Sequence, residues 1–270
     1  MQYDPIKRSL GAIFNTTPVL RKLFYRLLDL LLLRAWHIKK ELRQFAKDAP
    51  DHACALDAGS GFGQYVYYMS CKNPSWNVIG ADVKTEQIED CNRFFKKINF
   101  NNVGFEFADL TKFNHPEKYN FILSVDVMEH ILEDVQVFKN FYASMKKGGM
   151  LLISTPSDQG GSDVHDHDHD EGSFIDEHVR DGYNIDEIQE KLKLAGFTKT
   201  EAYYSYGKPG SKAWRLSMKY PLLMLNRSKA FFLILPLYYI LTFPLCLVLN
   251  KMDVAGKHNS GTGLIVKAWK

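Results

Sequence analysis

The spacing of apolar residues near the start of the chain predicts helices. Between residues 20 and 45, apolar side chains recur every three or four positions, and lysine and arginine fill much of the remaining surface. Leu30, Leu32 and Leu33 make the apolar side unusually wide. We expect one amphipathic helix or two, which either packs on the protein's own core or contacts a membrane or an apolar substrate.

From residue 53 onward, short apolar runs alternate with helical stretches. Regular alternation of this kind, with continuously apolar strands, predicts an α/β fold whose parallel sheet is covered on both faces. Strands are expected at residues 53–57, 77–82, 103–108, 120–125, 149–154, 198–205 and 262–269. Helices are expected at residues 63–71, 85–98, 135–145 and 185–195.

The segment 207–261, between the last two strands, has a different composition. Residues 230–249 form an uncharged, mainly apolar stretch that is long enough to span a bilayer. Pro236 and Pro244 disfavour one straight helix, because each proline removes a backbone hydrogen bond. If the strands on both sides belong to one sheet, the segment must leave and return on the same side. We therefore expect an interfacial or re-entrant hairpin of two short helices.

The net charge of +3 conceals a strong partition along the chain. Residues 1–48 hold ten Lys/Arg against four Asp/Glu, residues 207–270 hold ten against one, and the middle of the chain is acidic. Both basic segments are also the most apolar ones, which favours an anionic membrane surface as a partner and not nucleic acid.

The cysteines and the first residues bear on the compartment. The cysteines are widely spaced and form no CxxC pair, so we expect neither disulfides nor a zinc site. They are Cys54, Cys71, Cys91 and Cys246. The first residues lack the apolar core of a secretory signal, so we expect a cytoplasmic protein, peripheral or monotopic on the cytosolic face of the membrane.

The most informative motif is LDAGSGFG at residues 56–63, which closes the first expected strand and opens a helix. Glycines at such a turn let the backbone approach a ligand, and the helix N-terminus offers free N–H groups. A dinucleotide fingerprint that started at Gly59 would place its third glycine at Gln64, which disfavours a NAD-dependent oxidoreductase. Asp57 fits a cationic ligand better than a pyrophosphate.

This motif resembles the (D/E)xGxGxG motif of the class I S-adenosylmethionine-dependent methyltransferases. The resemblance covers roughly residues 50–205 and the last strand, and it implies a Rossmann-like, doubly wound, seven-stranded sheet and S-adenosyl-L-methionine as the cofactor. Asp82 stands where the family's acid binds the ribose hydroxyls, and Asp109 stands where its acid meets the adenine amino group. The cofactor-binding residues that the resemblance implies are Asp57, Ala58, Gly59, Gly61, Gly63, Asp82, Val83, Asp109, Leu110, Val125 and Asp126.

Methyl transfer needs little chemistry from the protein, because alignment with an activated sulfonium supplies most of the acceleration. A hydroxyl acceptor also needs a base, and histidine is the usual choice. His130, in the Glu-His pair after the fourth strand, has either a structural or a catalytic role, and His178 is the second candidate. His165, Arg180 and Tyr183 are candidates for contact with the acceptor.

The run HDHDHDE at residues 165–171 alternates histidines with carboxylates. Both are good ligands for a divalent metal, but alternate residues of an extended segment do not make a closed site. The glycines on both sides favour a flexible acidic loop over the active site instead. We therefore do not expect a metal.

These observations divide the chain into four segments. Residues 1–48 form an N-terminal amphipathic helical lid, 49–206 the methyltransferase core, 207–261 an apolar insert that forms a lid or contacts the membrane, and 262–270 the last core strand. The expected function is methylation of a small lipophilic acceptor, such as a quinone precursor, a phenol or polyketide, or a lipid, at the cytosolic membrane face. The alternative is a membrane-associated binding or scaffold protein that has lost methyl transfer.

Overall fold

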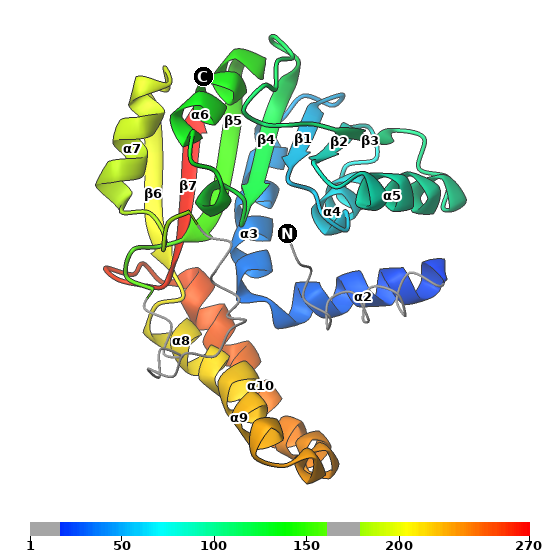
Figure 1. The fold of residues 1–270 in the computed structure, drawn as a ribbon, viewed down its shortest axis with the longest axis vertical. Coiled ribbons are helices and arrows are strands. Elements are labelled where there is room, and N and C mark those ends of the chain that lie inside the picture. The colour runs from blue at the N-terminus through cyan, green and yellow to red at the C-terminus, as the bar shows by residue number, and fades with distance from the viewer. Residues whose placement is uncertain (1–16, 161–178) are drawn as a thin grey trace.

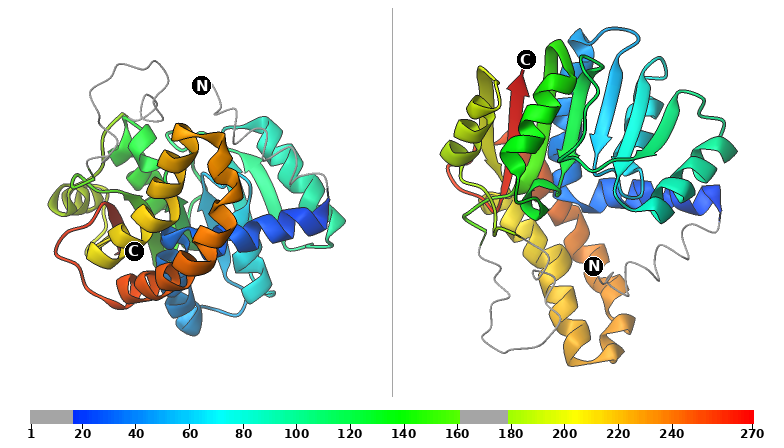
Figure 2. Two further views of the ribbon diagram at one scale, coloured as in Figure 1. Left: turned by 90° about the horizontal axis from the view of Figure 1, so that it is seen from below. Right: turned by 45° about the horizontal axis from the view of Figure 1, so that its top comes forward.

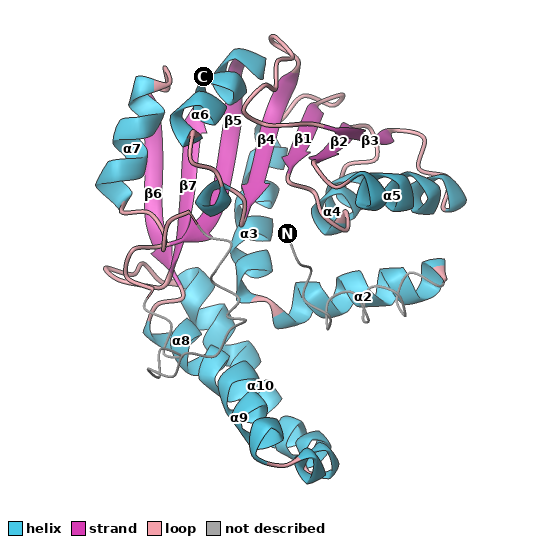
Figure 3. Ribbon diagram, in the orientation of Figure 1, coloured by secondary structure: helices cyan, strands magenta, loops and turns pink. Residues whose placement is uncertain are grey.

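The structure, a computed structural model, describes residues 17–160 and 179–270. Its centre is a seven-stranded sheet with the order β3-β2-β1-β4-β5-β7-β6 (Figures 1 and 3). The strands are β1 (Cys54–Ala58), β2 (Asn77–Asp82), β3 (Val103–Phe107), β4 (Tyr119–Val125), β5 (Met145–Pro156), β6 (Lys199–Ser205) and β7 (Gly263–Trp269). All seven lie where the sequence places them, although β5 begins earlier than expected.

The sheet is parallel except for β7, which runs antiparallel to both of its neighbours, β5 and β6. The direction of β7 follows from its connection: Ser205, the last residue of β6, pairs with Gly263, the first residue of β7. The insert between them therefore leaves and returns at the same edge of the sheet. This is the edge at which β1, β2 and β4 end.

Helices cover both faces of the sheet. One face packs against α3 (Leu33–Asp48), α4 (Gln64–Lys72) and α5 (Thr85–Lys97), and the other against α6 (Asp134–Ser144) and α7 (Ile185–Leu194). The strands read as continuous apolar runs because both of their faces are buried. Leu56, Ile122 and Leu152, for example, have no exposed surface.

The N-terminal pattern forms two helices, α2 (Pro18–Leu31) and α3, which meet at Leu32. The Thr17 hydroxyl caps α2 by accepting a hydrogen bond from the Leu20 N–H at 3.3 Å. Unlike most surface helices, α2 fully buries a polar pair, Arg21 and Tyr25, and leaves apolar side chains in solvent. The exposed ones are Val19, Leu23, Leu27, Leu30 and Leu31.

The insert folds into two helical arms, from Lys208 to Ala255, which we call the hairpin. Its first arm joins α8 (Lys208–Trp214), the π-helical turn η2 (Arg215–Lys219) and α9 (Tyr220–Arg227), its tip is the 3-10 turn η3 (Lys229–Leu233), and its second arm is α10 (Leu235–Ala255). The right view of Figure 2 shows it as an arm that extends from the sheet edge, and the left view shows it from below.

The expectation of two short helices is wrong for the second arm, because α10 continues through Pro244 as one helix. Contacts between the arms hold it in place. The Tyr238 hydroxyl donates to the Leu216 carbonyl at 2.7 Å, and the Tyr239 hydroxyl donates to the Ser217 carbonyl at 2.8 Å. Local proline chemistry is thus outweighed by packing along the hairpin.

Candidate cofactor site

Four carboxylates follow the edge of the sheet at which the parallel strands end. Asp109 comes after β3, Asp82 ends β2, Asp57 lies near the end of β1, and Asp126 comes directly after β4. These strands are neighbours in that order, so the carboxylates form a row. Three strand spacings make the row about 15 Å long, and ligands of open α/β sheets bind at this edge.

The loop between β1 and α4 approaches this row through its glycines. Gly59, Gly61 and Gly63 have φ values of 84°, 48° and 77°, which only glycine adopts readily. A Cβ on Gly59 would lie 2.2 Å from Val127 Cγ2, so glycine also lets the loop pack against the segment after β4. The Gly61 N–H donates to Asp82 Oδ2 at 2.9 Å.

Asp57 is the residue of the row that most clearly indicates a ligand-binding position. The residue is 1% exposed, and its Oδ2 atom has no hydrogen-bond partner among the described residues. Burial and then the charge of Asp82 raise the pKa of Asp57 to about 8, against a hydrogen bond from the Val66 backbone. A buried acceptor without a donor is costly, so a cationic donor group of a ligand fits here.

Asp82 and Asp109 are held ready to accept further hydrogen bonds. Asp82 accepts from the Gly61 and Lys84 N–H groups, one on each oxygen, which leaves lone pairs for hydroxyl donors. Asp109 accepts from the N–H and the hydroxyl of Thr111 at 3.0 and 2.7 Å. These bonds lower the pKa of Asp109 below its usual value.

Asp126 forms an ion pair that the sequence does not reveal. Its backbone has a φ of 50°, its N–H donates to the Ser154 carbonyl at 2.9 Å, and its carboxylate pairs with the Arg34 guanidinium of α3. The charge of Asp126 raises the pKa of Arg34, against the effect of burial. The N-terminal helices thus place a cation at the end of the row of carboxylates.

Glu129 lies close enough to this ion pair to be affected by both of its charges. The residue is 1% exposed, and its Oε2 accepts from the Thr155 hydroxyl at 3.1 Å. Burial and then the nearby charge of Asp126 raise the pKa of Glu129 to about 8. A second titratable carboxyl is therefore buried close to the strand ends.

A family model described as a methyltransferase domain matches residues 51–205, more than half of the chain. The chain belongs to the S-adenosylmethionine-dependent methyltransferases. The match covers the glycine loop and all four carboxylates of the row. S-adenosyl-L-methionine is the cofactor of this family, and its α-ammonium is a donor of the kind that Asp57 lacks.

Similar proteins have methyltransferase names. The chain is 33% identical over 100 residues to phosphoethanolamine N-methyltransferase 3 of Arabidopsis thaliana, a match over 37% of this chain and 20% of that protein. It spans less than a third of the length of the first curated relatives it matches.

Solved structures confirm the fold. A phosphoethanolamine N-methyltransferase 2 from Haemonchus contortus, in complex with phosphomonomethylethanolamine and S-adenosylhomocysteine, has a TM-score of 0.59 at 19% identity, over 85% of this chain and 51% of that one. A S-adenosylmethionine-dependent methyltransferase from Thermotoga maritima has a TM-score of 0.55 at 14% identity, over 97% and 99% of the two chains.

The remaining residues expected around the cofactor are distributed along the same edge. Ala58 and Leu110 are buried and support the loops, Val125 is half-buried, and Val83, directly after β2, is 51% exposed. An exposed apolar side chain beside Asp82 is available to cover an adenosine. That contact stays a prediction for this methyltransferase.

The candidate bases are less well placed by the structure. His130 is half-buried in the turn η1 (Met128–His130), where its N–H donates to the Val127 carbonyl at 3.0 Å. Its catalytic role stays a prediction. His165, His178 and the histidine-aspartate run of residues 165–171 lie outside the described residues. Within the described part of the chain, no group of three or more His, Cys, Asp or Glu side chains could hold a metal.

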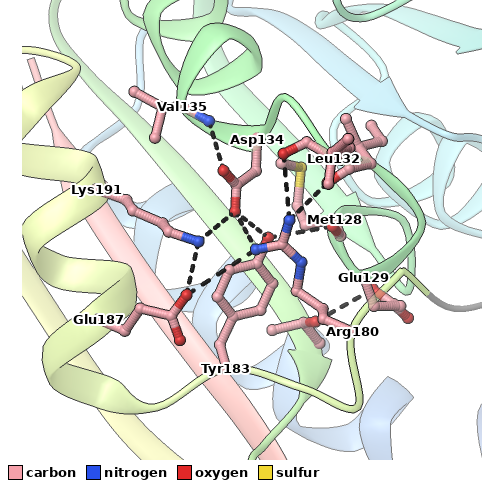
Figure 4. A network of polar contacts seen from close by, with 11 residues as sticks. Met128, Glu129, Leu132, Asp134, Val135, Arg180, Tyr183, Glu187 and Lys191 are labelled. Carbon is pink, nitrogen blue, oxygen red and sulfur yellow. Dashed lines mark hydrogen bonds and ion pairs between the residues drawn. The ribbon is translucent and has the colours of Figure 1, made fainter.

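Arg180 and Tyr183 take part in a polar network around Asp134, beside Met128 of η1 (Figure 4). The Arg180 guanidinium pairs with Asp134 and donates to the Ile131 carbonyl at 2.8 Å. The Tyr183 ring is fully buried, and its hydroxyl lies 2.8 Å from Asp134 Oδ2. These bonds join the segment before α7 to the start of α6. A role for either residue in acceptor binding stays a prediction.

The N-terminal helices also contact the glycine loop directly. Arg21 of α2 donates to the Phe62 carbonyl at 3.0 Å, and the Tyr25 hydroxyl donates to the same oxygen. Arg21 also pairs with Asp90 of α5. The loop is therefore held from outside by a helix that the sequence marks only as amphipathic.

Proposed function

We propose that this protein transfers a methyl group from S-adenosylmethionine to a lipophilic acceptor at the cytosolic face of a membrane. The observation that carries the proposal is the position of the hairpin. It leaves the sheet at the edge of the cofactor site, and it exposes large apolar side chains. An acceptor that partitions into a membrane could then reach the site from the surface on which the enzyme rests.

The hairpin has more exposed apolar surface than a soluble surface element needs. Leu233 at its tip is 87% exposed, and Ile240 and Leu241 of α10 are 69% and 71% exposed. Among the described helices, α10 is long and apolar enough to cross a membrane. Further exposed apolar residues are Met218, Leu222, Leu223, Phe232, Ile234, Leu237, Leu245, Val248 and Met252.

The charges of the hairpin favour a position in the interface. Asp253 is the single acidic residue of the segment 207–261, and it is fully buried, so every exposed charge there is positive. Arg227 ends α9 just before the tip and Lys229 is the first residue of the tip, where both can meet anionic headgroups at about 1 kcal/mol each. Full insertion of the tip into hydrocarbon would bury both charges.

The dimensions also suit an interfacial helix pair. Cys246, Asn250 and Asp253 of α10 are buried at the base of the hairpin. The part of α10 that extends beyond this base, from Leu235 to about Leu245, is about 15 Å long. This is about half of the hydrocarbon thickness of a bilayer. α2 holds the glycine loop with its buried side, and its exposed apolar side chains would add to this surface.

The names of the relatives support nitrogen as the first acceptor atom to test. Several are named as N-methyltransferases of phosphoethanolamine, and another, from Eschscholzia californica, as a (S)-tetrahydroprotoberberine N-methyltransferase. Among a quinone precursor, a phenol or polyketide, and a lipid, the amine headgroup of a lipid is thus the first acceptor to test. In the transfer the sulfonium loses its methyl group to the acceptor, and a neighbouring base such as His130 takes the acceptor's proton.

Methyl transfer is tested with labelled cofactor. The purified protein is incubated with S-adenosylmethionine that carries a labelled methyl group and with a lipid extract, and the organic phase is analysed. Label in the organic phase supports the proposal. Cofactor binding without label in any extract would indicate the alternative, a scaffold protein that keeps the fold. Asp82→Ala should weaken binding in calorimetry, and unchanged affinity would contradict the site.

Membrane binding is tested by sedimentation with vesicles of phosphatidylcholine and phosphatidylglycerol. We expect binding that high salt weakens but does not abolish, because apolar contacts remain. Phe232→Ser with Leu233→Ser should cost about 3 kcal/mol or more, which is roughly a 100-fold loss of partitioning.

A matched pair controls for the loss of exposed apolar surface elsewhere. Leu132 and Leu194 are 68% and 65% exposed, close to the values at the tip, but lie outside the hairpin. Leu132→Ser with Leu194→Ser should sediment like the unchanged protein. Equal binding by both double variants, or no binding by the unchanged protein, would refute the membrane part of the proposal.

A further inference from the structure

Asp253, near the end of α10, is a buried carboxylate that is not part of the row at the strand ends. The residue has no exposed surface. Its Oδ1 lies 2.9 Å from His37 Nε2 and accepts from the Tyr206 N–H at 3.2 Å. Its Oδ2 accepts from the Gly210 N–H at 2.9 Å and lies 3.3 Å from His258 Nε2. Burial raises the pKa of Asp253, but the hydrogen bonds with His37 and Gly210 lower it below its usual value, so the carboxylate is charged at neutral pH.

The partners of Asp253 belong to separate parts of the fold. His37 lies on α3, Tyr206 follows β6, and Gly210 lies in α8, the start of the first arm of the hairpin. α3 packs closely against this base (Figure 1), because a Cβ on Gly210 would lie 2.6 Å from Leu33 Cδ2 and 2.7 Å from Asp253 Oδ2. Asp253 therefore connects α3 with both arms of the hairpin.

Contacts continue from Asp253 to the row of carboxylates. Tyr206, whose N–H binds Asp253, accepts a hydrogen bond from the Arg34 N–H on its hydroxyl at 3.1 Å. The Arg34 guanidinium pairs with Asp126, the last member of the row. His37 lies about one helical turn after Arg34 on α3. Asp253 thus holds the turn of α3 that carries Arg34 at two points.

Two features indicate that these contacts set the position of Arg34 and do more than stabilise the fold. Apolar side chains of similar volume would join the helices without the cost of burying a charge, so a buried carboxylate is weak evidence for a purely stabilising role. Tyr206 has a φ of 55°, which a bulky residue seldom adopts and which is found mainly where surrounding contacts serve a functional site. The charge and the backbone conformation both fix directions that apolar packing would leave free.

We propose that Asp253 is a positioning residue of the methyltransferase: it orients the turn of α3 on which Arg34 meets Asp126 at the cofactor site. Asp253 and His37 both lie outside the residues that the family model matches. This role concerns cofactor binding and depends neither on the acceptor nor on the membrane. It gives the base of the hairpin a part in cofactor binding that the exposed end of the hairpin does not share.

A double-mutant cycle measures whether Asp253 acts through Arg34. Calorimetry gives the affinity for S-adenosylhomocysteine of the unchanged protein, Asp253→Asn, Arg34→Gln and the double variant. Asp253→Asn should weaken binding roughly fivefold, about the effect of one hydrogen bond, because the turn of α3 loses its charged partner. In the Arg34→Gln background, the same change should have no further effect. Asp48→Asn, an equal loss of charge at the exposed end of α3, should leave the affinity unchanged.

Two results of the cycle would overturn the proposal. Equal weakening in both backgrounds would mean that Asp253 only supports the fold. Unchanged affinity of Asp253→Asn would mean that its contacts do not reach the cofactor site.

If Asp253→Asn does not fold, a pair of variants at His37 tests the same point. His37→Gln keeps an N–H donor for Asp253 and should bind S-adenosylhomocysteine like the unchanged protein. His37→Leu loses the donor and should bind the ligand more weakly, but only while Arg34 is present. Equal affinities of the two His37 variants would contradict the proposal.

Discussion

The network around Asp134 should be the most sensitive polar site of the fold. Asp134 Oδ2 binds Lys191 and the Tyr183 hydroxyl, both at 2.8 Å, and pairs with Arg180, while its Oδ1 accepts from the Val135 N–H at 2.8 Å. Asp134→Asn keeps the shape and the bond to Val135, but it removes the charge that the two cations need.

The expected cost follows from burial. The Asp134 side chain is 4% exposed, whereas Arg180 and Lys191 are 17% and 21% exposed and keep some contact with water. Breaking a buried ion pair costs about 3 to 5 kcal/mol. We expect the lower value, about 3 kcal/mol, because the cations keep that contact. For a domain of this size, the melting temperature should fall by about 6 to 12 °C.

Urea unfolding and thermal melts at pH 7 measure the effect. Burial raises the pKa of Asp134, but hydrogen bonds from Lys191 and Tyr183 and the charge of Arg180 lower it below the usual value. Its stabilisation is therefore present above about pH 3.9 and is lost as the pH falls below it. Glu187→Gln is the control, because Glu187 binds the same cations but is 45% exposed. Equal losses of stability in both variants would refute the reasoning.

Three further outcomes are expected. Gly59→Ala should unfold more easily and bind S-adenosylhomocysteine more weakly, because its Cβ would overlap Val127 and its φ is 84°. Gly148→Ala is the control, because Gly148 has a φ of 78° but open space around it. It should lose only the stability that backbone strain costs, measured by urea unfolding, and its binding in calorimetry should not change. Without ligand, stability should decrease from about pH 4 to pH 8, because the folded state keeps a proton on Asp57, whose pKa is about 8, that the unfolded chain has lost. Asp57→Asn should therefore gain more stability over the unchanged protein at pH 8 than at pH 5, and an equal difference at both pH values would contradict this. Ser217 and Tyr238 lie on opposite arms where the arms are in contact, so a short turn can join them in place of residues 218–237. The shortened protein should fold and bind S-adenosylhomocysteine, but it should no longer sediment with vesicles. Loss of S-adenosylhomocysteine binding would show that the hairpin is part of the core.

The sequence predicts the sheet because its signals are local. Apolar runs, the glycine loop and the acids at strand ends are each recognised within a few consecutive residues. Each lies in the structure at the position that the sequence predicts. The ion pair between Arg34 and Asp126 joins residues 92 positions apart, and nothing distinguishes Arg34 from the other cations of its helix. The course of α10 through Pro244 depends on the opposite arm, which no local rule contains. The burial of Glu129 depends on its contact with Thr155 of β5, 26 positions away, which no local pattern contains.

The place of β7 in the sheet has a consequence for protein synthesis. β7 lies between β5 and β6, and β6 has no other strand partner within the described residues. As the chain is made from its N-terminus, both arms of the hairpin leave the ribosome before Gly263–Trp269 can close the sheet. The apolar hairpin is thus presented to its surroundings while the nascent core is still open. A ribosome-bound chain that is halted before residue 263 should therefore already bind vesicles at a stage when it does not yet bind the cofactor.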